Sequence, residues 1–128
     1  MISLPLRFTH KTRTQYYIAA ALWESFIFYL SAQPVLPSPD SFLWDFAFKK
    51  LSHMFVYFIL FWLIYKSIQF DIKHPLKLTI LAFCVAFVLA ISDEFHQSFV
   101  PGRTPTTKDV LFDTLGMAIA WLTLNKYV

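Results

Sequence analysis

The chain has 128 residues, of which 57% are hydrophobic, 20% are aromatic and only 15% are charged. A soluble domain of this size carries about 25% charged residues to cover its surface, so this composition predicts one domain whose outside mostly faces lipid. The net charge is +3, but the basic residues flank apolar runs, which indicates membrane topology and disfavours a nucleic-acid partner.

Four apolar segments follow one another and predict an all-α fold, an integral membrane bundle of four transmembrane helices in a single domain over residues 1–128. The expected spans are about residues 14–33, 50–69, 76–95 and 109–125, close to the roughly 20 residues that cross a bilayer. The first run follows a basic arm, is interrupted by Glu24 and lacks a small-x-small cleavage site. We therefore interpret it as a retained span and not as a signal peptide.

The connections are marked by proline and by aromatic residues. Three prolines, Pro34, Pro37 and Pro39, are expected to end the first helix and to begin a loop. We expect this loop to continue through residue 48 and to hold the aromatic side chains typical of a membrane–water interface, namely Trp44, Phe46 and Phe48. Residues 71–77 and 98–108 are the other predicted links. Cys84 excludes an intrachain disulfide and is interpreted as a small packing residue.

Basic residues near the span ends predict the orientation of the bundle. Seven of them fall on one side and four on the other, which predicts that both termini are cytoplasmic. The larger group is Arg7, Lys11, Arg13, Lys66, Lys73, Lys77 and Lys126, and the smaller is Lys49, Lys50, Arg103 and Lys108. The start of the second span, the end of the third and the start of the fourth are then expected at the outer face.

A polar stretch at residues 91–103 interrupts the apolar pattern and is the expected functional site. Asp93, His96 and Gln97 stand at i, i+3 and i+4, which places them on one helix face. The same four-residue spacing pairs His53 with Tyr57, and Asp109 with Asp113, at the outer ends of neighbouring spans. On the last span Gly116 and Ala120 continue that stripe, and such small residues let a neighbouring helix approach closely.

Several of these residues also have a simpler structural interpretation. Thr106 and Asp109 match a capping box, so Asp109 is also a candidate helix cap. His53 alone would be read as an interfacial histidine bonded to backbone. Glu24 lies near the middle of the first span, where an ionisable group usually faces the bundle interior, and it is a candidate intramembrane acid.

Asp93 and Glu94 lie near the C-terminal end of a helix, where the helix dipole disfavours negative charge. Burying an unpaired carboxylate costs several kcal/mol, so a cationic partner is expected. The candidates for this partner are Arg103, His96 and His53. The alternative is a purely structural polar network that joins three helix ends.

These motifs together resemble the VanZ-like family over essentially the whole chain. The resemblance rests on Phe28-Tyr-Leu-Ser-Ala-Gln-Pro34, His53-x-x-x-Tyr57, Asp93-Glu-Phe-His-Gln97, Pro101-Gly-Arg103 and Asp109-x-x-x-Asp113-Thr-x-Gly116. Asp113 departs from the family pattern, which often has Asn there. The resemblance implies a small multi-pass protein of the bacterial inner membrane and cell envelope, with a link to resistance against teicoplanin and other glycopeptide antibiotics.

The first function hypothesis is a binding protein whose outer pocket engages a lipid-linked cell-wall precursor or a lipoglycopeptide. Arg103 and Lys108 are expected to contact phosphate, and Gln97 and Tyr57 to complete the polar lining. The apolar side of the pocket is assigned to Trp44, Phe95 and Phe99.

The second hypothesis is a membrane-embedded hydrolase or transferase acting on an envelope lipid. Six candidate catalytic residues also supply ligands for a divalent metal: His53, Asp93, Glu94, His96, Asp109 and Asp113. In this hypothesis His96 is the general base and Asp93 orients it. No compact motif such as His-Glu-x-x-His fixes a metal, so the cofactor and the catalytic roles stay open. A transporter is disfavoured for a monomer with one mid-bilayer acid, and the oligomeric state is left open.

Overall fold

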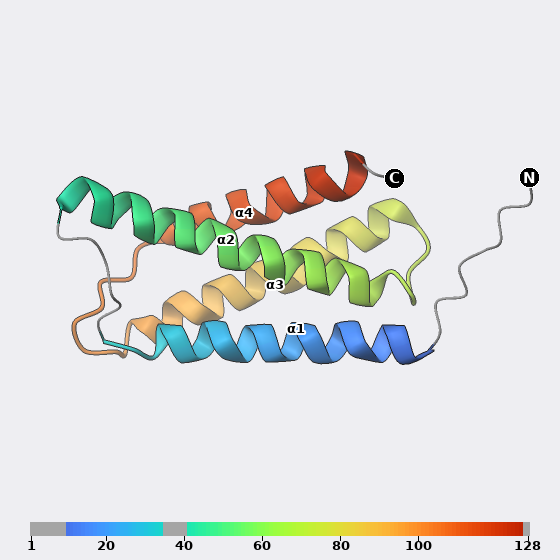
Figure 1. The fold of residues 1–128 in the computed structure, drawn as a ribbon, viewed down its shortest axis with the longest axis horizontal. Helices are drawn as coiled ribbons and strands as arrows, with labels where there is room; N and C mark the ends of the chain where they lie inside the picture. The colour runs from blue at the N-terminus through green and yellow to red at the C-terminus, as the bar shows by residue number, and fades with distance from the viewer. Residues whose placement is uncertain (1–9, 35–40, 127–128) are drawn as a thin grey trace, which may run out of the picture.

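The computed structural model describes residues 10–34 and 41–126. They form four α-helices: α1 (His10–Ser31), α2 (Phe42–Ile68), α3 (Pro75–Gln97) and α4 (Thr107–Lys126). No strand occurs within these two ranges, so the all-α prediction is confirmed. Successive helices run in opposite directions (Figure 1). The ends of α1 and α3 therefore meet the starts of α2 and α4, and we call this the polar end of the bundle.

The start of α2 differs from the sequence prediction, because the expected loop through residue 48 is wrong. Ser41 takes the extended N-cap conformation, with φ −82° and ψ 132°, and residues 42–48 are helical. Within this first part of the helix Lys49 pairs with Asp45 one turn earlier at 2.8 Å, a spacing that supports helix formation. The residues assigned to the basic arm at positions 1–9, together with Pro37 and Pro39, lie outside the described residues.

The polar stretch is helical for longer than expected. Helix α3 begins with Pro75 in its first turn, where a missing N–H is tolerated, and continues to Gln97. Asp93, Glu94 and His96 are therefore all held on a helix, each in a fixed direction. The connecting loop that follows is shorter than predicted, because α4 begins at Thr107.

Helix α2 is central and contacts each of the other three, most extensively α4. Its buried residues Tyr57, Leu60, Phe61 and Ile64 form much of the core. They meet small residues of α3, since Ala82, Ala86 and Ala90 repeat every four positions and are each fully buried. Helix α1 packs on α2 and to a small extent on α3.

The close approach of α4 to α2 is confirmed at Gly116. A Cβ atom added to this glycine would lie 2.9 Å from the Cα and carbonyl carbon of Met54, and it would meet the Met54 carbonyl oxygen too. Backbone is therefore packed against backbone at this crossing. The predicted small-residue stripe continues to Ala120, which is fully buried.

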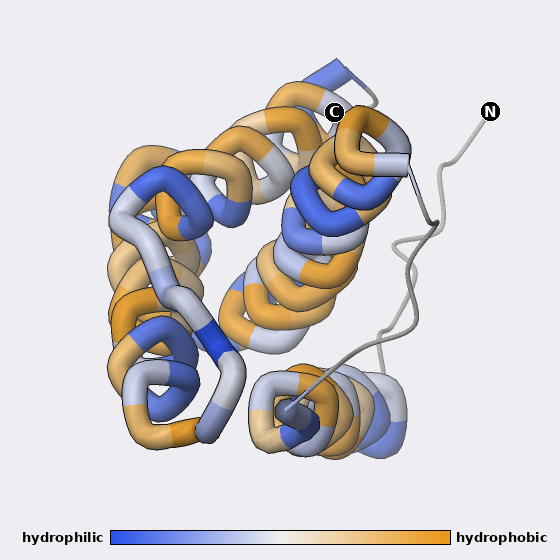
Figure 2. Tube along the Cα trace, turned by 90° about the vertical axis from the view of Figure 1, so that its left-hand side faces the viewer, coloured by the Kyte–Doolittle hydropathy of each residue, from blue (hydrophilic) through white to orange (hydrophobic). Residues whose placement is uncertain are grey.

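The outer surface of the bundle carries many large apolar side chains, among them Leu22, Phe55, Val88, Leu111 and Leu122. Viewed from the polar end, hydrophobic residues recur along all four helices, with hydrophilic ones among them (Figure 2). Within the described ranges, α2 and α3 are long and apolar enough to cross a membrane. Helices α1 and α4 do not meet these criteria of length and hydropathy. The prediction of four helices is therefore confirmed, whereas the prediction that all four span a membrane is not. Cys84, predicted to be a packing residue, is exposed on α3.

Candidate functional site

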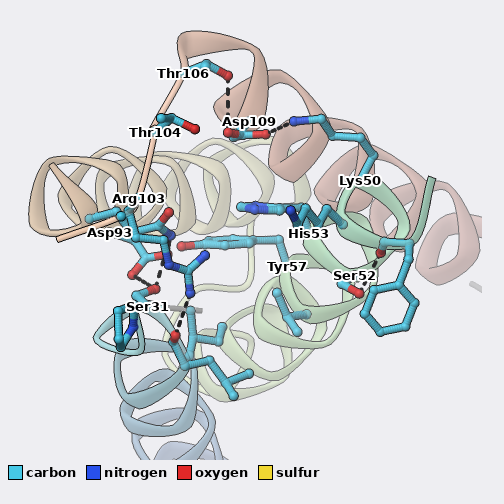
Figure 3. A pocket seen from close by; sticks show the side chains of 18 residues that line it. Ser31, Lys50, Ser52, His53, Tyr57, Asp93, Arg103, Thr104, Thr106 and Asp109 are labelled. Atoms are coloured by element: carbon cyan, nitrogen blue, oxygen red, sulfur yellow. Dashed lines mark hydrogen bonds and ion pairs between the residues drawn. The ribbon is translucent and has the colours of Figure 1, made fainter. Parts of the chain in front are cut away.

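A cavity of about 420 Å³ lies at the polar end of the bundle (Figure 3). All four helices and the loop between α3 and α4 contribute to its wall. Its polar lining includes Ser31, Lys50, His53, Tyr57, Asp93, Gln97, Arg103 and Asp109. The sequence-predicted residues from three separate segments therefore meet around one space.

Arg103 is directed toward α1 by a tight turn. Proline and glycine occupy the two central positions of the turn Val100–Arg103, and the Arg103 N–H donates to the Val100 carbonyl at 3.2 Å. Gly102 has a φ of +81°, which favours glycine. This residue pattern and this φ are those of a type II turn. The turn therefore explains why proline and glycine precede Arg103 in the sequence.

The Arg103 guanidinium binds two backbone carbonyls, one in the last turn of α1 and one just beyond its end. Its Nε donates to the Gln33 carbonyl and its Nη2 to the Leu30 carbonyl, both at 2.8 Å. The Leu30 carbonyl also accepts from the Gln33 N–H at 3.2 Å, and the dipole at a helix C-terminus favours a cation. Arg103 forms no ion pair with any carboxylate in residues 10–34 and 41–126. Arg103, one of the three candidate cationic partners of Asp93 and Glu94, therefore forms an ion pair with neither.

Asp93 is held by neutral donors instead of a cation. The Ser31 hydroxyl donates to Asp93 Oδ1, and the Gln97 amide donates to Asp93 Oδ2 at 3.3 Å. The same amide also donates to the Ser31 hydroxyl at 3.3 Å. The shared face of Asp93 and Gln97 is thus confirmed, and Ser31 is a site residue that the sequence reasoning missed. The available signal was its position on the same helix face as Glu24 and Ile27, which lie seven and four residues earlier.

His96 points away from this network. Its ring stacks on Phe28 of α1 with centroids 4.1 Å apart and an interplanar angle of 18°. No hydrogen bond joins it to Asp93 among the described side chains, so the predicted base–orienter pair is wrong. At i+3 from Asp93 the ring contacts instead an aromatic side chain of α1.

Asp109 is the acceptor of two donors from different segments. The Lys50 ammonium forms an ion pair with Asp109 Oδ1, and the Thr106 hydroxyl donates to Asp109 Oδ2 at 3.1 Å. In the predicted capping box the Thr106 hydroxyl would accept a hydrogen bond from a backbone N–H, whereas here it donates one to the Asp109 carboxylate. Lys50 was missed as a site residue, although Lys50, His53 and Tyr57 share one helix face at i, i+3 and i+7.

His53 and Asp113 form a second pair deeper in the bundle. His53 Nδ1 and Asp113 Oδ1 are 2.8 Å apart. Glu94 lies beside them, and one ligand atom from each of the three residues falls within 4.8 Å of the others. The buried Tyr57 hydroxyl has no partner in the described chain and points to the side of the cavity that holds Asp93 and Arg103 (Figure 3).

Other predicted residues lie elsewhere. Glu24 is half-buried on α1, and its Oε2 is buried with no hydrogen bond from a described residue. Lys108 is exposed and does not line the cavity. The aromatic residues assigned to its apolar side are also exposed and do not line it: Trp44, Phe95 and Phe99. The apolar lining comes instead from Ile27, Leu30, Pro34, Phe48 and Val56.

Fold and site together define a class: a small all-α bundle with membrane-capable helices, an apolar exterior and a polar cavity at one end. The sequence matches the VanZ/LLP1 family over residues 3–126, which is nearly the whole chain. The chain belongs to the VanZ/LLP1 family, as its motifs predicted. Comparison with curated proteins and with solved structures gives no match.

Proposed function

We propose that this chain is a four-span protein of the bacterial inner membrane, with cytoplasmic termini and the cavity at the outer face. The apolar exterior supports this proposal, as does the excess of basic residues near the opposite end. The start of α1 and the end of α4 lie at the same end of the bundle (Figure 1), as an even number of crossings requires. Membership of the VanZ/LLP1 family supports, at the family level, a resemblance to teicoplanin-resistance proteins.

The cavity is the observation on which the proposed function of this site rests. We propose that it binds the polar headgroup of an amphiphile, either a lipid-linked cell-wall precursor or a lipoglycopeptide antibiotic. Its volume of about 420 Å³ falls in the range of about 300–1,000 Å³ found for small-ligand pockets. Such a headgroup would enter from the membrane surface, while the attached chain lay along the apolar outer faces of the helices.

Two cations are placed to contact an anionic headgroup. Arg103 lines the cavity and uses two of its five N–H donors on the Leu30 and Gln33 carbonyls, so three remain for a ligand. Lys50 also lines the cavity, beside Asp109. We therefore assign the phosphate contacts to Arg103 and Lys50 in place of Arg103 and Lys108. A hydrogen bond to a charged group contributes about 1.5–3 kcal/mol, so the loss of either cation should weaken ligand binding by a measurable amount.

The alternative function is a membrane-embedded, metal-assisted hydrolase or transferase acting on an envelope lipid. The specific observation in its favour is the convergence of His53, Glu94 and Asp113 beside the cavity. The expected general base His96 is not part of that convergence.

Direct binding tests the headgroup proposal. The full chain, purified in detergent and placed in lipid nanodiscs, would be titrated separately with a polyprenyl-diphosphate-linked cell-wall precursor and with teicoplanin. We expect saturable binding of one of them, weakened about tenfold or more by Lys50→Gln. The matched control is Lys73→Gln, which removes a lysine at the opposite end.

Two results would overturn the headgroup proposal. One is that neither compound binds the wild-type chain. The other is that Lys50→Gln and Lys73→Gln bind with equal affinity while both elute as folded protein.

A further inference from the structure

We propose that His53, Glu94 and Asp113 form a binding site for a divalent transition-metal ion beside the cavity. Each residue comes from a different helix: His53 from α2, Glu94 from α3 and Asp113 from α4. The proposal does not depend on what the cavity binds. We refer to these three residues as the metal cluster.

The geometry of the metal cluster is close to that of a coordination shell. Its three ligand atoms lie within 4.8 Å of one another, and His53 Nδ1 is 2.8 Å from Asp113 Oδ1. Ligands bound to zinc at about 2.0–2.2 Å are at most about 4.4 Å apart. Side-chain movements on the scale of an ångström would therefore complete the shell, with no change in the helix positions.

Unpartnered carboxylate oxygens point to a ligand that the chain itself does not supply. Both oxygens of Glu94 and Oδ2 of Asp113 are buried and accept no hydrogen bond from any described residue. Glu94 is 9% exposed and Asp113 only 1%. A buried carboxylate without partners is costly, and coordination to a cation is one of the ways in which proteins offset that cost. These oxygens distinguish the metal cluster from Asp93 and Asp109, whose oxygens have donors.

The charge around the cavity also favours a divalent cation. Four carboxyl groups gather at the polar end, from Asp93, Glu94, Asp109 and Asp113. The permanent cations among their neighbours are Lys50 and Arg103, and Arg103 already donates to the Leu30 and Gln33 carbonyls. Asp93, Glu94 and Asp113 therefore lack a permanently charged partner. A divalent ion in the metal cluster would offset the charge of Glu94 and Asp113.

The donor set indicates which ions would bind. One imidazole and two carboxylates suit zinc or manganese, whereas magnesium and calcium prefer sites built from oxygen alone. Three protein ligands also leave a coordination position open. His53 lines the cavity, so an ion at the metal cluster would lie at the cavity's edge.

Metal retention tests the proposal. The full chain, carrying a purification tag without histidine, would be stripped with chelator in detergent, incubated with Zn²⁺ or Mn²⁺, and passed over a gel-filtration column. Mass spectrometry of the eluted protein would then give metal per chain. We expect about one equivalent in the wild type. Removing an outer-shell partner of a metal ligand lowers metal affinity by about 10–100-fold. Glu94→Gln and Asp113→Asn each remove a ligand itself, so we expect a loss of affinity at least as large.

The controls separate a site from incidental binding. His74→Gln and Asp71→Asn remove a histidine and an acid at the opposite end of the bundle, and both should retain the metal. Thermal unfolding with and without Zn²⁺ gives a second measure, since a ligand of the native state raises the melting temperature. A wild-type chain that retains no metal and shows no such shift would overturn the proposal, and so would folded variants that retain as much metal as the wild type.

Discussion

Arg103 Nη2 donates a 2.8 Å hydrogen bond to the carbonyl oxygen of Leu30, which is 73 positions away in the chain. This contact joins the loop between α3 and α4 to the last turn of α1. The loop therefore closes the polar end of the bundle, and Arg103 has a structural role in addition to any contact with a ligand.

The first prediction concerns the stability of this closure. Arg103→Ala should lower the free energy of unfolding by about 2 kcal/mol or more, because the carbonyls of Leu30 and Gln33 lose a charged donor. Arg103→Lys should restore only part of this, since one ammonium cannot reproduce the two-nitrogen fork. Denaturant unfolding in detergent measures both. The control Arg13→Ala, which breaks an exposed ion pair with Asp71, should cost less than about 1 kcal/mol. Equal losses at the two arginines would contradict the assignment.

The second prediction concerns the crossing of α2 and α4. On an exposed helix, Gly→Ala stabilises by about 1 kcal/mol. At Gly116 the sign should reverse, with a loss of about 1–3 kcal/mol, because the new methyl group would meet the backbone of Met54. Thermal unfolding would measure the change, and Leu115→Ala, at an exposed neighbouring position, serves as the control. A stabilised Gly116→Ala variant would show that the two backbones are not in contact.

The third prediction concerns the support of Asp93. Ser31→Ala should destabilise the fold by about 1–3 kcal/mol, because a buried carboxylate loses a donor. Ser31 and Gln97 donate to the same carboxylate, so their effects should not add in a double-mutant cycle with Gln97→Ala. A coupling energy near zero would mean that the two donors act separately.

The fourth prediction tests the proposed topology in cells. In a Cys84→Ser background, a thiol introduced by Thr104→Cys should react with a membrane-impermeant maleimide from outside. A thiol introduced by His74→Cys should react only after permeabilisation. Both positions are exposed in the structure, so burial within the protein would not account for a difference. The opposite pattern would place the cavity on the cytoplasmic side.

The amino-acid sequence by itself determined the helices and the region where the polar groups gather. The apolar runs predicted four helices, and spacing within a helix correctly paired Asp93 with Gln97. These features depend on local conformation and on positions three or four residues apart, which can be read along the chain. The helical start of α2 was missed, because aromatic residues typical of an interface are also compatible with a helix.

Only the tertiary structure decided which partner each polar group has. Arg103 binds the Leu30 and Gln33 carbonyls because a type II turn directs it there, and His96 stacks on Phe28. Lys50 meets Asp109 across 59 positions of sequence. These pairings depend on the relative height and rotation of neighbouring helices, which close contacts such as that of Gly116 with Met54 set. Spacing along a single helix does not contain that information, because it leaves the helix free to slide and turn against its neighbours.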